Sequence, residues 1–365
     1  MTTLKLRRAW FQVHKWIGLI LAILIIPLSL SGAALVWDEA LDRVVNPDRY
    51  AVSGSATIAP DRYVAAARSS LKAGDHVATL TLPDGDGPVV LVANRAAKEQ
   101  RPGPPPRTIV YLDPPTAKIL AVTDGSGGIV RFLHILHGSL QVPGVGRSIV
   151  GWIGVFMMLS TFTGLWLWWP TMGGIKRAFR WKRHPNLDTN LHQTFGFWIA
   201  LPLFVLSLTG AWISFPGFFG ALSGEAPRGE RGPRSRPLPL ERPAQSIASV
   251  VDRAQATAPG KVERIGWPTT KSPDWTIALT GDTPRNIKVA DDTGLASAAP
   301  EREAEGLGRL MRRIHDGNGM GPVWQTIIFV GGILPALLAV TGIIMWWRAR
   351  GWRAQVKDRQ RKKAA

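Results

Sequence analysis

Four long apolar stretches dominate the hydropathy pattern of the chain. They are free of acidic residues, and they cover residues 16–37, 148–169, 191–215 and 322–347. Such a stretch predicts a transmembrane helix, because about 20 apolar residues cross the hydrocarbon core of a bilayer. Tryptophans stand at or near the ends of these stretches, where aromatic side chains favour the membrane interface. The pattern therefore predicts four membrane-spanning helices rather than the buried helices of a soluble protein.

The positive charge of the chain gathers at the ends of these stretches. The formal net charge is +18, and basic residues crowd the N-terminus, the loop between the second and third stretches, and the C-terminus. Lys and Arg in short loops and tails mark the cytoplasmic side of a membrane. Both termini and the 170–190 loop are therefore expected in the cytoplasm, and the two long connecting segments outside. This distribution favours contact with membrane lipid and argues against nucleic acid as a partner.

The two long external segments have the pattern of small α+β domains. Each contains a helical run followed by short strand-like runs, such as PVVLVAN in the first and WTIALT in the second. The expected fold is an α-helical membrane protein with two small appended domains. Its parts are transmembrane helix 1 (8–37), external domain 1 (38–130), an interfacial helix with transmembrane helix 2 (131–169), a cytoplasmic loop (170–190), transmembrane helix 3 (191–216), external domain 2 (217–306), an interfacial helix with transmembrane helix 4 (307–347), and a basic cytoplasmic tail (348–365).

A constant offset of 178 residues relates the two halves of the chain. It relates His14 to His192, His137 to His315, Gly32 to Gly210, and Gly164 to Gly342. Such a repeat predicts a tandem duplication, and each copy contains two of the four spans. Two copies with the same orientation are related by a pseudo-two-fold axis along the membrane normal. Equivalent residues are then expected at equal depth, facing each other across that axis.

The paired histidines are the strongest candidates for a functional site. The axis sets His14 opposite His192 near the cytoplasmic surface, and His137 opposite His315 near the external surface. Two neutral imidazoles that face each other across a bundle can hold the iron of a six-coordinate haem, and the apolar spans form a low-dielectric slot for it. The sequence therefore predicts two non-covalent haem b groups, each with two histidine ligands.

Other chemistry fits these histidines less well. The chain has no cysteine, which excludes disulfides, thiolate-ligated haem, Cys-ligated iron–sulfur clusters and covalent haem attachment. Structural zinc takes four ligands at one centre, whereas the two pairs are expected roughly 30 Å apart across the bilayer. A proton relay needs carboxylates, which the four apolar stretches lack. The remaining His76 and His184 are expected to be solvated surface residues.

The surroundings of the predicted outer haem leave alternatives open. His134 lies three residues before His137 on the same helical face, and the repeat relates it to Arg312. His137 is the expected ligand. His134 is an alternative ligand, a neighbour of a haem propionate or a contact to substrate. Arg312 and Arg313 are candidates for pairing with propionates, because Arg binds carboxylates well.

The four repeated glycines also have two interpretations. Each follows a Ser or Thr inside a span, and each lies at the expected depth of one haem. A glycine lets a porphyrin approach the helix backbone closely. It equally allows two helices to pack closely, which membrane proteins favour. Gly32, Gly164, Gly210 and Gly342 are therefore candidate cofactor contacts.

Four motifs together resemble the PepSY-associated transmembrane family. They are FQVHKWIGL…LSLSG, LHGSLQVPGVGRSIVGW…TGLWLWWP, LDTNLHQTFGFW…SLTG and IHDGNGMGPVW…VTGIIMWW. The run YLDPPTAKIL is similar to the end of a PepSY domain, with Ala117 in place of the usual Gly. The resemblance implies a bacterial inner-membrane protein with two periplasmic PepSY-like domains. It also implies a reductase of ferric siderophores that carries two b-type haems with bis-histidine ligation.

The expected function is therefore electron transfer across the inner membrane. Electrons would pass from the cytoplasmic side to a periplasmic acceptor, a ferric siderophore or another ferric chelate, and release Fe(II). The sequence contains no motif that resembles a nicotinamide or flavin site, so the donor is expected to be a separate cytoplasmic molecule or a quinol. The alternatives are a non-redox PepSY membrane anchor that binds or inhibits a periplasmic partner, and a haem electron conduit to a periplasmic enzyme.

Overall fold

The computed structural model describes residues 3–95, 107–125, 127–169, 184–224, 238–281, 285–299 and 306–364. The chain forms two compact units, and each combines segments that are far apart in the sequence. The helical unit comprises Met1–Asp38, Phe132–Arg228 and Ala304–Ala365. The sheet unit comprises Glu39–Arg131 and Gly229–Glu303.

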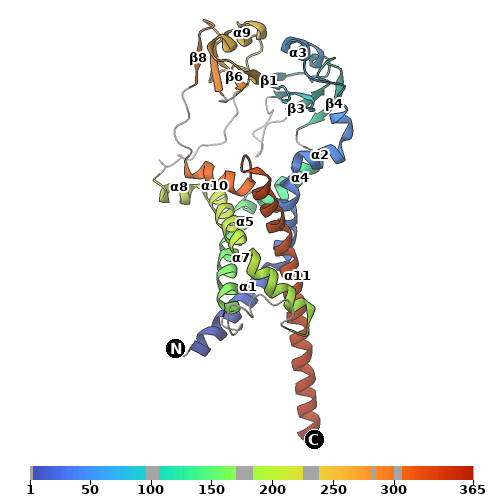
Figure 1. The fold of residues 1–365 in the computed structure, drawn as a ribbon, viewed down its shortest axis with the longest axis vertical. Coiled ribbons are helices and arrows are strands. Elements are labelled where there is room, and N and C mark those ends of the chain that lie inside the picture. The colour runs from blue at the N-terminus through green and yellow to red at the C-terminus, as the bar shows by residue number, and fades with distance from the viewer. Residues whose placement is uncertain are drawn as a thin grey trace. The chain divides into compact units, whose positions relative to one another are not determined.

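Four long helices form the helical unit (Figure 1). They are α1 (Thr3–Leu35), α5 (Gly146–Trp168), α7 (Leu187–Ser214) and α11 (Gly321–Ala364). Each is long and apolar enough to cross a membrane, which confirms the prediction of four spans. The basic tail, expected as a separate segment, continues α11 instead, because its Ala, Arg, Lys and Gln residues are good helix formers. Most of the predicted 170–190 loop, residues 170–183, lies outside the described residues.

The four helices pack in a closed ring. Helix α1 contacts α5 and α11, and α7 contacts the same two helices. Thus α1 lies diagonally opposite α7, and α5 lies diagonally opposite α11. Side chains that point inward from diagonal helices can meet at the centre of the bundle.

Short helices precede the second and fourth spans. They are α4 (Ile129–Ser139) and α10 (Leu307–Asp316), whose starts are 178 residues apart. Each ends in a turn with left-handed backbone, at Leu140 and Gln141 after α4 and at Gly317 after α10. Glycine adopts this conformation without strain, whereas Leu140 and Gln141 adopt it at some cost. These turns separate the predicted interfacial helices from the spans that follow.

An eight-stranded antiparallel sheet forms the second unit. Its strands are β1 (Asp75–Thr81), β2 (Val89–Arg95), β3 (Arg107–Leu112), β4 (Ile119–Asp124), β5 (Lys261–Gly266), β6 (Asp274–Thr280), β7 (Arg285–Ala290) and β8 (Ala296–Ala298). They lie in the order β4-β3-β2-β1-β5-β6-β7-β8, so the two halves of the chain contribute mirrored halves of one sheet. The remaining short elements of the chain are α2 (Asp38–Val45), η1 (Pro47–Tyr50), α3 (Pro60–Arg68), α8 (Pro216–Leu222) and α9 (Ile247–Thr257).

The external segments were expected as two separate domains, but the structure joins them. Strand β1 pairs with β5 at Thr79↔Gly266, Leu80↔Ile265 and Thr81↔Arg264. In two separate sheets β1 and β5 would be edge strands with unpaired backbone groups, and this pairing removes these two edges, so that β4 and β8 are the edge strands of the joined sheet. The helix-then-strands order of each half is as predicted.

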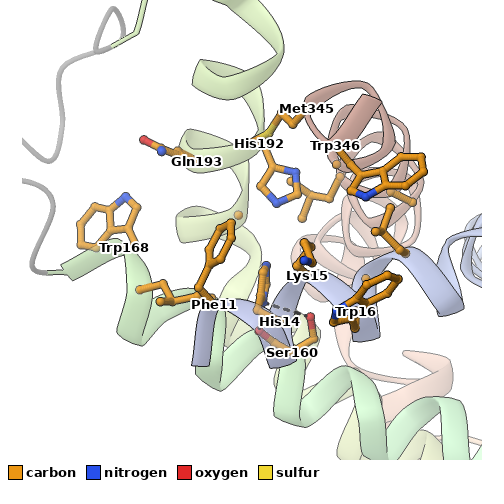
Figure 2. A pocket seen from close by; sticks show the side chains of 18 of the residues that line it. Phe11, His14, Lys15, Trp16, Ser160, Trp168, His192, Gln193, Met345 and Trp346 are labelled. Atoms are coloured by element: carbon orange, nitrogen blue, oxygen red, sulfur yellow. Dashed lines mark hydrogen bonds between the residues drawn. The ribbon is translucent and has the colours of Figure 1, made fainter. Parts of the chain in front are cut away.

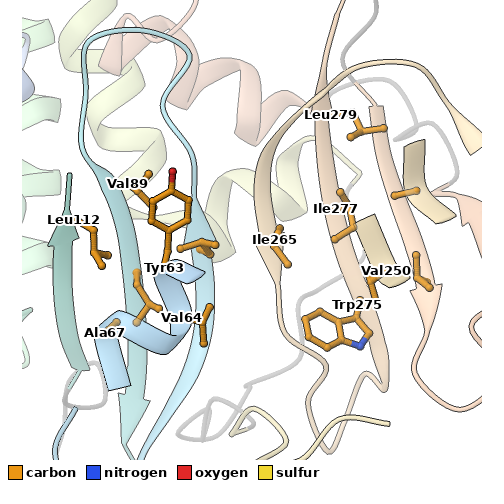
Figure 3. Close-up of a cluster of buried hydrophobic side chains, with 14 of the residues drawn as sticks. Tyr63, Val64, Ala67, Val89, Leu112, Val250, Ile265, Trp275, Ile277 and Leu279 are labelled. Carbon is orange, nitrogen blue, oxygen red and sulfur yellow. The ribbon is translucent and has the colours of Figure 1, made fainter. Parts of the chain in front are cut away.

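One hydrophobic core serves both halves of the sheet unit. Strand burial alternates, with Trp275 and Ile277 of β6 buried on the same face (Figure 3). Helices α3 and α9 contact each other and cover that face, where Tyr63 and Val250 are completely buried. The alternation is typical of an antiparallel sheet with helices on one side only.

Two buried aspartates follow strands β3 and β7 at equivalent positions. Asp113 accepts hydrogen bonds from the backbone N and the hydroxyl of Ser53, both at 2.7 Å. Asp291 accepts from the backbone N of Ala244 and of Gln245 at 2.8 and 3.1 Å, and from Trp275 Nε1 at 2.8 Å. Burial by itself raises the pKa of these carboxyls, but the hydrogen bonds outweigh it and lower both pKa values. Each carboxylate thus ties the segment before a core helix to the end of a strand.

We expect Asp291→Asn to destabilise the sheet unit by about 2 kcal/mol, since hydrogen bonds to charged groups contribute about 1.5–3 kcal/mol each. Because the folded pKa is depressed, the stabilisation is present above the unfolded pKa of about 4 and is lost as pH falls through the folded value. Hydrogen exchange of peptides from β6 and β7 measures this change in the full chain. Asp292→Asn is the matched control, because the neighbouring Asp292 is exposed. If Asp292→Asn increased hydrogen exchange as much as Asp291→Asn does, this would contradict the stabilising role of the Asp291 carboxylate.

Candidate functional site

The first candidate site lies between two diagonal helices. His14 of α1 and His192 of α7 lie with their ring centroids 6.3 Å apart and their planes at 84°. Figure 2 shows both rings at one cavity. The structure therefore brings together the pair that the repeat predicted for the cytoplasmic end.

Each of these rings is held by a Ser/Thr–Gly pair on a neighbouring helix. His14 Nδ1 lies 3.1 Å from Thr163 Oγ1 and 3.1 Å from the carbonyl oxygen of Ser160 on α5. His192 Nδ1 lies 3.0 Å from Thr341 Oγ1 on α11. Both Thr hydroxyls donate their own hydrogen to carbonyls of the preceding turn, so they can only accept from the imidazoles. The proton therefore lies on Nδ1 of each ring, and Nε2 keeps a free lone pair.

The second candidate site repeats this arrangement between the two short helices. His137 of α4 and His315 of α10 lie with ring centroids 5.9 Å apart and planes at 38°. His137 Nδ1 donates to the carbonyl oxygen of Leu28 at 2.8 Å, and His315 Nδ1 donates to Thr209 Oγ1 at 3.0 Å. Burial lowers the pKa of His137, and burial followed by the charge of His137 lowers the pKa of His315 to about 3. Both rings are thus neutral at pH 7, the form that binds metal through nitrogen.

The repeated glycines make room for the imidazoles. A Cβ added at Gly32 would lie 2.6 Å from His137 Cε1, and one added at Gly164 would lie 3.0 Å from His14 Cε1. At Gly210 and Gly342 the corresponding distances to His315 and His192 are 3.1 and 3.4 Å. Neither earlier interpretation, porphyrin approach or helix packing, included these contacts. The sequence contains a partial signal, a Ser/Thr–Gly pair at the expected depth of every paired histidine, but it does not show which side chain each glycine contacts.

The other predicted site residues lie outside the two pairs. His134 is an exposed residue of α4, and its ring does not take part in the His137–His315 contact. Arg312 is exposed and forms an ion pair with Asp316 at 3.7 Å. Asp316 follows His315 directly and was not foreseen; burial raises its pKa, while the charge of Arg312 opposes that rise. His76 lies 3.8 Å from Glu241 in the sheet unit.

The spacing of each pair suits a bound metal. One metal bound to both Nε2 atoms, with bonds of about 2.0 Å, separates the ring centroids by roughly 6 Å. The observed 6.3 and 5.9 Å agree with this value. No group of three or more His, Cys, Asp or Glu in the described part of the chain could hold a metal ion. Two axial nitrogens alone suit a metal that brings its own equatorial ligands, as the iron of haem does.

A large cavity adjoins the first pair. Its volume is about 1370 Å³, above the roughly 300–1,000 Å³ typical of ligand pockets. Its walls include His14, His192 and the side chains of Phe11, Trp168 and Trp346 (Figure 2). Apolar and aromatic walls of this size can accommodate a flat macrocycle beside the two imidazoles.

These features describe a chain with four helices long and apolar enough to span a membrane and with two pairs of facing, half-buried imidazoles. The family model of the PepSY-associated TM region matches residues 11–349, nearly the whole chain, and includes all four paired histidines. The chain therefore belongs to the PepSY-associated TM region family. The comparison with curated proteins finds no match.

Proposed function

We propose that the chain is a dihaem b oxidoreductase of the bacterial inner membrane that reduces a ferric chelate, a siderophore complex, in the periplasm. His14 and His192 would hold one haem, and His137 and His315 the other. The observation that carries the proposal is the geometry of the two pairs, whose centroid distances suit a shared metal and whose Nε2 lone pairs are free. When bound, a haem supplies one-electron chemistry, since its iron alternates between Fe(III) and Fe(II).

The protein's own residues favour electron transfer over substrate coordination. Two imidazoles per site would hold the iron of a haem from opposite sides of the bundle, and they would keep water and substrate away from it. Each ring is fixed against a neighbouring long helix by a hydrogen bond of its Nδ1 atom. The partners are Thr163, Thr341, Thr209 and the Leu28 carbonyl. Such outer contacts orient a ligating imidazole and raise its basicity. Little movement is then needed when the charge of the site changes by one.

The overall reaction follows from charge and ligand chemistry. A donor on the cytoplasmic side loses one electron, and the Fe(III) of a chelate on the periplasmic side gains it and becomes Fe(II). Siderophores use hard oxygen donors, which hold Fe(II) far more weakly than Fe(III), so the metal is released. The basic N- and C-terminal ends of α1 and α11 support a cytoplasmic location of both termini. The tandem duplication, with two PepSY-like halves outside the membrane, is part of the same proposal.

Anaerobic reoxidation of the purified, dithionite-reduced protein tests this function. Haem bands in the reduced-minus-oxidised spectrum are expected, followed by their loss when a ferric siderophore is added and by trapping of Fe(II) with a coloured chelator. The Ga(III) siderophore is the matched control, because Ga(III) has the charge of Fe(III) but accepts no electron. A non-redox anchor predicts no haem bands. A conduit to a periplasmic enzyme predicts bands that ferric siderophores do not reoxidise.

We expect Thr341→Val to weaken retention of the haem at His192 by about 10- to 100-fold, the usual effect of losing an outer partner of a metal ligand. Valine keeps the shape of the side chain but cannot accept the hydrogen bond from Nδ1. Titration of haem-depleted protein measures the affinity, and Thr341→Ser is the control because it keeps the hydroxyl. A loss in the Ser variant as large as in the Val variant would show that the hydrogen bond is not the cause.

A further inference from the structure

The cavity beside His14 and His192 has a strongly basic edge. Among its described lining residues there is no Asp or Glu, whereas the cations are Arg7, Arg8, Lys15, Arg348 and Arg350. An anion-free wall with several cations attracts negative groups, and the effect is stronger where water is partly excluded.

Of these cations, Arg348 forms an ion pair with a carboxylate in the part of the chain that the structure describes. Arg348 Nη1 lies 2.5 Å from Asp188 Oδ1, and Nη2 donates to Thr189 Oγ1 at 2.9 Å. Arg7 instead donates to the neutral carbonyl oxygen of Leu167 at 3.0 Å. That contact fixes the position of the guanidinium and leaves its charge, with most of its five donors, for another group.

Two further cations are positioned by aromatic rings. Lys15 Nζ lies 4.7 Å from the ring centroid of Trp16, and it donates to the neutral Gln12 side chain. The Arg350 guanidinium lies 5.6 Å from the ring centroid of Trp346. Cation–π contacts orient a basic group without neutralising it.

Four of the five cations, Arg7, Arg8, Arg348 and Arg350, lie toward one end of the cavity, whereas Lys15 follows His14 directly. Arg7 lies about 10 Å before His14 along α1, at 1.5 Å per residue. Arg350 lies about 12 Å beyond Gly342 along α11 by the same rise. The rest of the wall is mostly apolar, with Leu19, Met157 and Leu203 among its residues. Apart from Lys15, the cavity is therefore mostly apolar around the imidazoles and cationic toward the N-terminal end of α1 and the C-terminal end of α11.

We propose that this basic edge binds the carboxylates of the tetrapyrrole held by His14 and His192, with Arg7 and Arg350 as the principal partners. The inference rests on the proposed function and adds the orientation of the ligand, whose acid groups face the terminal ends of α1 and α11. A macrocycle in an apolar slot needs its carboxylates to be paired or solvated, because burying them alone is costly. Charge-assisted hydrogen bonds from Arg supply that pairing at one end of the cavity only.

A comparison of haem with its dimethyl ester tests this role, since the ester has the same iron macrocycle without the free carboxylates. Haem-depleted protein carrying His137→Ala is titrated with each compound at the Soret band, so that only the first site binds. We expect haem to bind about 10- to 100-fold more tightly than the ester, as for a lost charge-assisted hydrogen bond. Arg7→Gln and Arg350→Gln should weaken haem binding by a similar factor and leave ester binding unchanged.

Lys5→Gln is the matched control, because Lys5 is an exposed cation of α1 that does not line the cavity. It should change neither titration. Equal affinity of the unaltered site for haem and ester would overturn the inference, as would a loss in Lys5→Gln equal to that in Arg7→Gln. This latter result would indicate a general effect of charge, such as attraction of anionic lipid. Failure of both compounds to bind would instead overturn the proposed function itself.

Discussion

Under the proposed function, replacing His192 by Ala should remove one haem from each chain and leave the other in place. His192 would supply one of the two imidazole nitrogens that hold the iron at its site, and His14 alone would hold it far more weakly. The second site lies on different helices, α4 and α10, and keeps both of its imidazoles. We therefore expect the haem content to fall from two per chain to about one. Reduction of the ferric chelate by a cytoplasmic-side donor should stop, because the transfer path is interrupted.

The haem-to-protein ratio of the purified variants measures this effect. His137→Ala is the reciprocal variant and should remove the other haem. His134→Ala and His184→Ala are matched controls, because both are exposed histidines outside the two pairs. They should retain both haems. A His134→Ala variant that loses the outer haem, while His137→Ala keeps it, would transfer the ligand role to His134.

Gly32→Ala should abolish haem binding at His137 and His315. The added Cβ would lie 2.6 Å from His137 Cε1 and 2.9 Å from its Nδ1, distances that a real methyl group does not adopt. The His137 ring is hydrogen-bonded at 2.8 Å to the carbonyl oxygen of Leu28, which lies on α1 as Gly32 does. The ring therefore cannot move away from Gly32 without losing this hydrogen bond. Displacement of the ring would also move Nε2 away from the point at which it would hold the iron. We expect at least a 100-fold loss of affinity at this site, the upper end for disturbed ligand orientation.

A graded series of glycine variants makes the steric argument sharper. The added Cβ lies 2.6 Å from its imidazole at Gly32, 3.0 Å at Gly164 and 3.4 Å at Gly342, which is ordinary contact. Haem loss should follow that order, with Gly342→Ala nearly unaffected. Gly351→Ala is the control, because nothing lies within 4 Å of a Cβ added at Gly351 of α11 and Gly351 does not line the cavity. Equal haem content in Gly32→Ala and Gly351→Ala would refute the role of Gly32.

The sequence predicted the four apolar helices and the two facing histidine pairs. Hydropathy alone identified four helices, since each crossing needs a long apolar run. The 178-residue offset identified which histidines meet, because His14 and His192 come from diagonal helices of one ring. The role of the glycines could not be derived in the same way. Gly32 contacts His137 only because α4 packs against α1 at that point, and a run of apolar residues does not specify its neighbours.

In the sheet unit, too, the strands could be predicted from the sequence but their neighbours could not. Alternating burial in β2 and β6 follows from their sequences, with hydrophobic residues at every second position. The pairing of Leu80 with Ile265 joins segments far apart in the chain, and strand periodicity contains no information on which strand becomes a neighbour. Two domains were therefore expected where the chain forms one sheet.

The central claim is that each histidine pair holds one haem iron through two imidazoles. Pyridine haemochromogen analysis of the purified chain, combined with low-temperature electron paramagnetic resonance of its oxidised form, tests this directly. We expect two haem b per chain and only low-spin ferric signals, because each iron would be held by two imidazole nitrogens of the protein. A colourless protein after expression with ample haem, or a high-spin signal from an iron with an open position, would contradict the account.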